Sequence, residues 1–216
     1  MKKQIVVIGL GPFGASVAKS LAEQGHQVLG IDLDEKKVNA IANQITQSAI
    51  IHNISEETLV DLGVKEFDIA VVSISDIESS ILFAQILMDL GIKEIISRAQ
   101  DELHGRVLER LGVSKVVFPE KDMGLRLANN LVSSSIIDYI ELSKEYNVFE
   151  ISAPEEFFNK TLAELRVRAN YNINVIAIKK HNHKDIVIAP PSDSLIEEND
   201  ILVVIGKNSD LSKLGQ

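Results

Sequence analysis

Short apolar runs alternate with amphipathic stretches along the first two thirds of the chain. The first run, Ile-Val-Val-Ile at residues 5–8, predicts a strand that is buried on both faces. Stretches with helical spacing of apolar residues separate it from similar runs at residues 28–31, 49–51, 68–74, 94–97 and 115–118. Strands that alternate with helices in this way predict an α/β fold with a Rossmann-like, doubly wound parallel sheet of six strands.

The pattern changes in the last third of the chain, after a helical stretch that ends in Ser133, Ser134 and Ser135. Short strands dominate from there on, at residues 148–151, 174–178, 186–189 and 201–205. We therefore predict a first domain over residues 1–135, followed over residues 136–216 by a linker and a small α+β domain. A domain of this size barely closes its own core, so pairing with a second copy is expected.

A glycine motif connects the first strand to the first helix. Residues 9–14, Gly-Leu-Gly-Pro-Phe-Gly, have the spacing G-x-G-x-x-G. In such motifs Gly9 would permit the tight turn, Gly11 the approach of backbone to a phosphate, and Gly14 the close packing of helix and strand. The second strand then ends at Asp32, where an acid takes the ribose hydroxyls. A glycine-rich turn with an ordinary surface acid is the alternative, but the complete strand–turn–helix–strand–acid order favours an adenine nucleotide.

Polar residues stand at the ends of the other predicted strands. They are Asn53, Ser73, Ser75, Arg98 and Glu120. Because the carboxyl ends of parallel strands meet at one edge of a sheet, these side chains should share a rim with the glycine motif. An amide, hydroxyls and a guanidinium suit the base, ribose and phosphates of a nucleotide, although Arg98 could instead form a surface ion pair.

Composition excludes several classes of function. The net charge of −9 and the pI near 5.1 argue against a nucleic-acid or anionic-membrane partner. The chain has no cysteine, which suits a reducing compartment, and no apolar run approaches the length of a transmembrane helix. Met1-Lys2-Lys3 leads directly into the first strand, so we expect no signal peptide and a cytoplasmic protein.

Candidate catalytic residues are sparse. An NAD-dependent oxidoreductase is the alternative function, but it would need a proton donor near the nicotinamide. His26 and His104 stand in neither a triad nor a metal-binding pattern. His181 and His183 could form a metal-binding pair, but a solvated hairpin tip over residues 181–185 is the favoured interpretation. We therefore expect a chain that binds a nucleotide without being an enzyme.

One predicted helix is unusually apolar. Its apolar residues are Ile81, Leu82, Ile86, Leu87 and Leu90. Such a helix either lies under the sheet or meets another subunit. We therefore expect an oligomer, a dimer at least.

Five segments carry a resemblance to a known family. They are G-L-G-P-F-G, I-D-L-D, F-P-E-K-D-M-G, D-Y-I-E-L-S and L-R-V-R-A-N-Y-N-I-N-V-I-A-I-K. In this order they resemble the RCK proteins (regulators of conductance of potassium), most of all the regulatory subunits of Ktr/TrkA-type bacterial potassium uptake systems. The resemblance implies a nucleotide-binding RCK_N domain and a ligand-binding RCK_C domain. It also implies a gating ring, up to an octamer, on the cytoplasmic face of a KtrB/TrkH-like membrane potassium channel subunit.

The resemblance implies a site for ATP or ADP, or for NAD(H) as in some members of the family. Its residues would be Gly9, Gly11, Phe13, Gly14, Asp32, Leu33, Asn53, Ser73, Arg98 and Glu120. Glu120 resembles a residue that helps to hold a cation (Mg, Na or K) near the phosphates, although it could equally cap the following helix. Pro12 departs from the family, because members that discriminate ATP usually have arginine there. Selectivity for ATP over ADP is therefore not implied.

The resemblance also implies a cyclic di-AMP site between paired RCK_C domains. Its residues would be Arg168, Ile173, Asn174, Val175 and Pro190. Two arginines that flank an apolar cleft suit a symmetric ligand with two phosphates and two flat bases. The alternative for Arg168 is an ion pair with Glu164 along one short helix.

Overall fold

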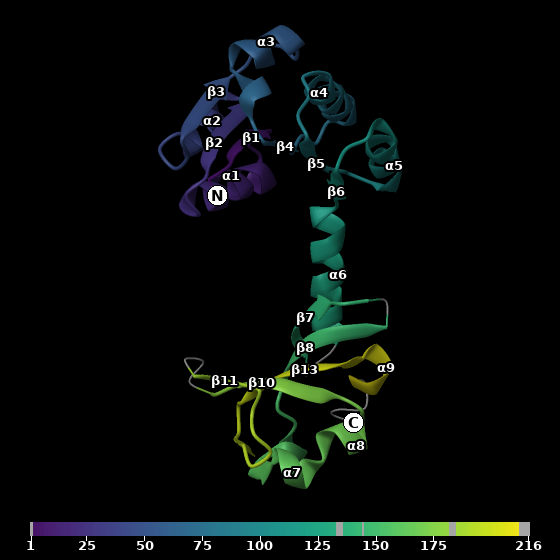
Figure 1. Ribbon diagram of the computed structural model, residues 1–216. Coiled ribbons are helices and arrows are strands. Elements are labelled where there is room, and N and C mark those ends of the chain that lie inside the picture. The colour runs from purple at the N-terminus through teal and green to yellow at the C-terminus, as the bar shows by residue number, and fades with distance from the viewer. Residues whose placement is uncertain (1, 133–135, 144, 182–184, 212–216) are drawn as a thin grey trace. The chain divides into compact units, whose positions relative to one another are not determined.

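The computed structural model describes residues 2–132, 136–143, 145–181 and 185–211 (Figure 1). It forms two compact units, Met1–Lys121 and Asp122–Gln216. The limit between them falls inside helix α6 (Pro119–Val132), whereas the predicted domains meet at residues 135 and 136. Ser133–Ser135 and residues 182–184 of the predicted hairpin tip lie outside the described residues.

The first unit is built on a parallel six-stranded sheet, as predicted. The strand order is β3-β2-β1-β4-β5-β6. The strands are β1 (Gln4–Ile8), β2 (Gln27–Asp32), β3 (Gln47–Ile50), β4 (Ile69–Val72), β5 (Glu94–Arg98) and β6 (Lys115–Val117). Because β1 lies between β2 and β4, the order reverses there, and ligands of such sheets bind outside the carboxyl ends of the strands at this point.

Helices cover both faces of this sheet, because successive residues of each strand point to opposite sides. Val6 and Ile8 of β1 belong to one core, with α3 (Glu56–Asp61), α4 (Ile77–Asp89) and α5 (Glu102–Leu111). Ile5 and Val7 belong to a second core, with α1 (Pro12–Glu23) and α2 (Glu35–Ile41). A 3₁₀ turn, η1 (Val64–Glu66), leads into β4. The Rossmann-like, doubly wound arrangement is thereby confirmed.

The apolar helix predicted at residues 81–90 is α4. Phe83, Ala84 and Leu87 are buried under the sheet, which is one of the two predicted arrangements. Ile77 and Leu82 remain exposed, so α4 also has apolar side chains on its outer face. In the described part of the chain, each helix is too short or too polar to cross a bilayer.

The second unit is a small α+β domain, as predicted (Figure 1). Its antiparallel sheet has the order β11-β10-β13-β8-β7, formed by β7 (Ile136–Glu141), β8 (Tyr146–Ser152), β10 (Asn174–Lys179), β11 (Ile186–Ile188) and β13 (Ile201–Lys207). The other elements are η2 (Glu155–Phe157), β9 (Lys160–Thr161), α7 (Leu162–Leu165), α8 (Val167–Tyr171), β12 (Leu195–Ile196) and α9 (Asn208–Leu211). Its core is centred on Phe149, Phe157, Ile173 and Leu202.

Two elements differ from the sequence-based expectation. Residues 136–141, predicted as part of a linker, form β7 and pair antiparallel with β8. The third strand begins at Gln47 rather than Ala49, because Gln47 and Ser48 pair with β2 although they are polar. For Gln47 and Ser48 a neighbouring strand, rather than the local apolar pattern, determines the element, whereas the isoleucines and the tyrosine of residues 136–141 favour a strand themselves.

His104 is a buried titratable group whose role in stability can be measured. It is 2% exposed, its Nδ1 accepts the Gln100 N–H at 3.2 Å, and its Nε2 has no hydrogen-bond partner among the described residues. Burial lowers the pKa of His104 below its ordinary value of 6.5, and the Asp101 carboxylate offsets this only partly. In the folded chain His104 therefore binds a proton less readily than in the unfolded chain.

We expect the free energy of unfolding to fall as the pH drops below about 6.5, because protonation of His104 then favours the unfolded chain. Urea unfolding between pH 7.5 and pH 5 measures this fall. The variant His104→Gln should show a smaller fall over this window, while the exposed His52→Gln serves as the matched control. A fall of equal size in the wild type and in His104→Gln would contradict the expectation.

Candidate functional site

The glycine motif forms the turn that it predicts. Gly9 has a φ of +93°, in the region that favours glycine, and its N–H donates to the Ile31 carbonyl at 2.8 Å. A Cβ atom on Gly14 would lie 1.9 Å from the carbonyl oxygen of Gly9, so no other residue fits there without moving the turn. A Cβ atom on Gly11 would meet nothing within 4 Å. Gly14 is thus fixed by packing, and Gly11 leaves space open.

Helix α1 begins immediately after this turn, with Gly11 at its N-cap and Pro12 as its first residue. The N–H groups of a first helical turn have no partner within the helix, and here those of Phe13 and Gly14 belong to this set. Pro12 has no N–H to offer. The first turn of α1 can therefore bind an anion through backbone N–H groups but not through the residue at position 12.

The side chain of Asp32 is held in place by the backbone. Its Oδ2 accepts the Leu10 N–H at 2.7 Å, and its Oδ1 accepts the Asp34 N–H at 2.8 Å. The Lys37 Nζ lies 3.5 Å from Oδ2. An ionised carboxylate has about four lone-pair sites, so Asp32 keeps acceptor capacity for hydroxyl groups. It links the glycine turn, β2 and α2 at the rim.

A cavity of about 430 Å³ opens at the carboxyl ends of β1, β2 and β4. Its lining residues are Ile8, Gly9, Gly11, Ile31, Asp32, Leu33, Asp34, Lys37, Ile51, Ser73, Ile74, Ser75, Asp76, Ser79 and Phe83. Five of them were predicted for the nucleotide site: Gly9, Gly11, Asp32, Leu33 and Ser73. The hydroxyl of Ser73 is buried and has no hydrogen-bond partner in the part of the chain that the structure describes. A ligand in this cavity could supply that partner.

The other predicted residues of this site lie outside the cavity wall. Phe13 and Gly14 are in the first turn of α1. The Asn53 Oδ1 accepts the Thr58 hydroxyl at 2.8 Å, which places Asn53 beside the start of α3. Arg98 and Glu120 bind each other in the structure.

The Arg98–Glu120 contact is bidentate. The distance from Nη2 to Oε1 is 2.6 Å, and that from Nε to Oε2 is 3.2 Å. The Arg98 Nη1 also donates to the Ser75 hydroxyl at 3.1 Å, and Ser75 lines the cavity. The ion pair considered as the alternative for Arg98 is therefore present, one hydrogen bond away from the cavity.

Four polar lining residues were not predicted from the sequence as part of this site: Asp34, Lys37, Asp76 and Ser79. Asp34 and Asp76 cap α2 and α4, and a cap that follows a strand of a parallel sheet must lie at this rim. The sequence therefore carried a signal for both. The hydroxyl and N–H of Ser79 lower the pKa of Asp76 and keep it charged. Lys37 lies within α2, and no sequence signal pointed to it.

A second cavity, of about 320 Å³, lies in the second unit. Its lining residues are Leu162, Ala163, Arg166, Val167, Arg168, Ala169, Ile173, Asn174 and Val175. Four of the five residues predicted for the cyclic di-AMP site, Arg168, Ile173, Asn174 and Val175, are among them, whereas Pro190 is not. Arg166, which sequence reasoning did not assign, joins α7 to α8 with a φ of +45°.

Glu164 does not pair with Arg168 in the described part of the chain. Its Oε2 instead accepts the Thr161 N–H at 2.7 Å and the Thr161 hydroxyl at 2.8 Å, as part of a capping box on α7. These hydrogen bonds lower the pKa of Glu164. Arg168 is exposed and lines the cavity.

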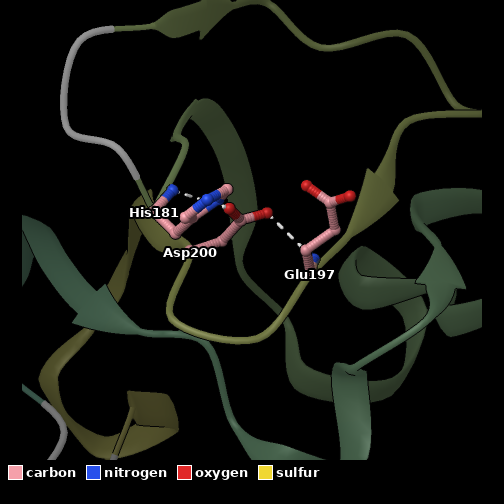
Figure 2. Close-up of side chains that lie close together, drawn as sticks. All are labelled: His181, Glu197 and Asp200. Carbon is pink, nitrogen blue, oxygen red and sulfur yellow. Dashed lines mark hydrogen bonds between the residues drawn. The ribbon is translucent and has the colours of Figure 1, made fainter.

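A cluster of His181, Glu197 and Asp200 is the metal-ligand set that the described residues of the second unit bring together (Figure 2). Asp200 is fully buried and accepts the backbone N–H groups of His181 and Glu197, at 3.2 and 2.9 Å. His183, the other half of the predicted histidine pair, lies outside the described residues.

Lys180 already binds both carboxylates of this cluster. Its Nζ donates to Asp200 Oδ2 at 2.9 Å, to Glu197 Oε2 at 3.1 Å and to the Leu195 carbonyl at 3.0 Å. Burial alone would lower the pKa of Lys180, but the hydrogen bonds to the two carboxylates outweigh it and raise the pKa. A metal ion would have to displace this ammonium group. The geometry therefore fits a turn stabilised by Lys180 better than an open metal site.

Comparisons with known proteins cover nearly the whole chain. Residues 5–119 match the family model of the TrkA-N domain, and residues 148–216 match that of the TrkA-C domain. The chain is 41% identical over 214 residues to the Ktr system potassium uptake protein C of Bacillus subtilis, which covers 99% of this chain and 96% of that protein.

Solved structures share the fold. The RCK domain of GsuK is 24% identical, with a TM-score of 0.54, over 97% of this chain and 45% of that chain. The GsuK channel bound to NAD is 23% identical, also with a TM-score of 0.54, over 99% of this chain and 38% of that chain.

The two glycines with opposite surroundings give a matched test of the turn. Gly14→Ala should lower the free energy of unfolding by about 1–3 kcal/mol, since its Cβ would press on the Gly9 carbonyl. Gly11→Ala should lower it by at most about 1 kcal/mol, because nothing lies within 4 Å of the added Cβ and only the preference of the N-cap position for glycine over alanine is lost. Urea unfolding monitored by circular dichroism measures both. Equal stability of the two variants would mean that the turn relaxes freely.

Proposed function

Because the chain belongs to the TrkA/Ktr family of RCK proteins, we propose that it is the nucleotide-binding regulatory subunit of a potassium uptake system. The observation that carries the proposal is the cavity at the glycine turn. There two backbone N–H groups hold Asp32, and the buried hydroxyl of Ser73 has no hydrogen-bond partner among the described residues. The name of the Bacillus subtilis relative and the NAD bound to the GsuK channel support the same role.

The ligand of this cavity is an adenine nucleotide: ATP, ADP or NAD(H). Its ribose hydroxyls donate to Asp32, and its phosphates lie against Gly11 and the first-turn N–H groups of α1. Leu33, half-exposed at the wall, offers an apolar contact for the base. Pro12 brings no charge to the terminal phosphate, so ATP and ADP bind with similar affinity. The role of Glu120 in holding a cation remains a prediction.

The role is regulatory rather than catalytic. The described lining of the cavity has no histidine or tyrosine that could exchange a proton with a substrate of the nicotinamide, and its lysine, Lys37, lies 3.5 Å from the Asp32 carboxylate. A nucleotide then acts by binding one conformation of the assembly more tightly than another.

The partner is a KtrB/TrkH-like potassium channel subunit in the membrane, contacted from the cytoplasm by a homo-oligomer, from a dimer to an octameric ring. Exposed apolar side chains support assembly. They are Ile77 and Leu82 of α4 and Met123, Leu125, Leu127 and Leu131 of α6. Apolar side chains that cluster on helix surfaces in this way are typical of interaction sites.

The second cavity binds cyclic di-AMP between two copies of the second unit. Arg166 and Arg168 supply guanidinium groups for the phosphates, and Ile173 and Val175 supply apolar contacts for the bases. Pro190 does not line the cavity of one chain, so its proposed contact would come from a paired copy.

The nucleotide proposal is tested by Asp32→Ala. We expect calorimetry to show ATP and ADP binding weakened at least about tenfold, because charge-assisted hydrogen bonds to the ribose are lost. In liposomes with the membrane potassium subunit, the same variant should remove the effect of nucleotide on potassium flux.

Asp32→Ala also removes the acceptor of the Leu10 and Asp34 N–H groups, so Gly11→Ala is the second variant, which adds a methyl group at the cavity wall without a clash with the protein. Unchanged nucleotide affinity in both variants would refute this site. Turnover of NADH with hydroxy acids would instead favour an oxidoreductase.

The cyclic di-AMP proposal is tested by Arg168→Ala. We expect the wild-type chain to bind the dinucleotide with micromolar or tighter affinity and one ligand per pair of chains. The variant should lose this binding and retain ATP binding, because it removes a guanidinium from the second cavity only. Arg110→Ala, on the surface of α5, is the matched control. Equal binding by Arg168→Ala and the wild type would place the ligand elsewhere.

A further inference from the structure

The first cavity has an acidic wall. Asp32, Asp34 and Asp76 line it, and Lys37 is the one cation among its lining residues in the described chain. Lys37 already lies 3.5 Å from the Asp32 carboxylate. A ligand with several phosphates therefore needs a further cation close to this wall.

Arg98 is in position to be that cation. Its side chain is 17% exposed at the carboxyl end of β5, and its Nη1 is hydrogen-bonded to Ser75 of the cavity wall. The guanidinium is occupied, however, because Glu120 binds it through both carboxylate oxygens. Carboxylates and phosphates are alternative bidentate partners for the same face of an arginine.

We propose that Glu120 competes with the ligand's phosphates for Arg98, so that the Arg98–Glu120 ion pair opens when a phosphate-bearing nucleotide enters the cavity. The proposal rests on the nucleotide-binding function stated above. Glu120 is 63% exposed, so it returns to water easily when it is released. It is also the second residue of α6, where the N–H groups of the first helical turn stabilise a negative charge. The exchange therefore leaves neither charged group buried without a partner.

The Arg98–Glu120 ion pair also connects the end of β5 to the start of α6. A second ion pair, between Lys121 Nζ of α6 and Glu102 Oε1 of α5 at 2.8 Å, also holds the start of α6, and it does not involve the cavity. When Arg98 binds a phosphate, the Arg98–Glu120 ion pair is lost and the Lys121–Glu102 ion pair stays. The charge of the ligand, rather than its base or ribose, is then sensed at the first turn of α6, the helix in which the two units meet along the chain.

The test compares ATP, ADP and adenosine by calorimetry on the full chain in EDTA, which removes contacts mediated by divalent cations. Glu120→Gln should bind ATP and ADP roughly three- to tenfold more tightly, because Arg98 is free, and adenosine with unchanged affinity. In the Arg98→Gln background, Glu120→Gln should bring no gain. Glu102→Gln, which breaks only the neighbouring ion pair, is the matched control and should change none of the affinities.

Amide hydrogen exchange of residues 120–124 is the second measurement. ATP should speed exchange there relative to adenosine in the wild type, and the difference should vanish in Glu120→Gln. Glu120→Ala repeats both measurements if Glu120→Gln does not fold.

The proposal is overturned if Glu120→Gln binds ATP more weakly or equally, if adenosine gains as much as ATP, or if the gain persists without Arg98. It is also overturned if ATP and adenosine leave the same exchange pattern. If the wild-type chain binds neither the nucleotides nor adenosine, the nucleotide-binding function itself is refuted. The proposed competition for Arg98 is then refuted as well.

Discussion

The approach of α1 to the glycine turn is the constraint on which the first unit depends. The backbone atoms of Gly9 and Gly14 come so close that a single methyl group would separate them. This contact sets where α1 begins, and with it the direction of its first N–H groups. The Leu10 N–H that follows Gly9 then fixes Asp32. The shape of the rim thus follows from two glycines, Gly9 and Gly14, and from the carboxylate of Asp32.

Much of this arrangement could be predicted from the sequence because it depends on local rules. An apolar run between polar stretches must be buried, and a strand that is buried on both faces needs helices on both sides. The observed cores on the two faces of β1 follow from this alternation. The glycine spacing and Asp32 stand in a similarly strict order along the chain. The second cavity was expected mainly from the family resemblance, and physical reasoning added only Arg168, taken once from each of two copies.

The features that sequence reasoning missed depend on contacts between distant segments. Residues 136–141, Ile-Ile-Asp-Tyr-Ile-Glu, are mostly residues that favour strands, but the sequence alone does not show that they pair with β8 to form β7. Arg98 and Glu120 were assigned separately to a phosphate and a cation, whereas the structure joins them across 22 residues. Lys180 lies beside one of the two histidines considered as a metal pair, yet its contacts with Glu197 and Asp200 decide the electrostatics of that cluster. Charge pairing of this kind follows from tertiary proximity, which a single sequence does not encode by any short-range pattern.

The buried hydroxyl of Ser73, which has no partner among the residues that the structure describes, bears on the lifetime of the protein. A buried hydroxyl without a partner lowers stability by about 1–3 kcal/mol, and a ligand that bonds to it recovers part of this energy. Occupancy and folding are therefore thermodynamically linked, so that the empty chain unfolds more often than the filled one. In a cell, proteases that degrade unfolded chains would remove the empty form first. The abundance of the protein would then follow the supply of its ligand without any change in its synthesis.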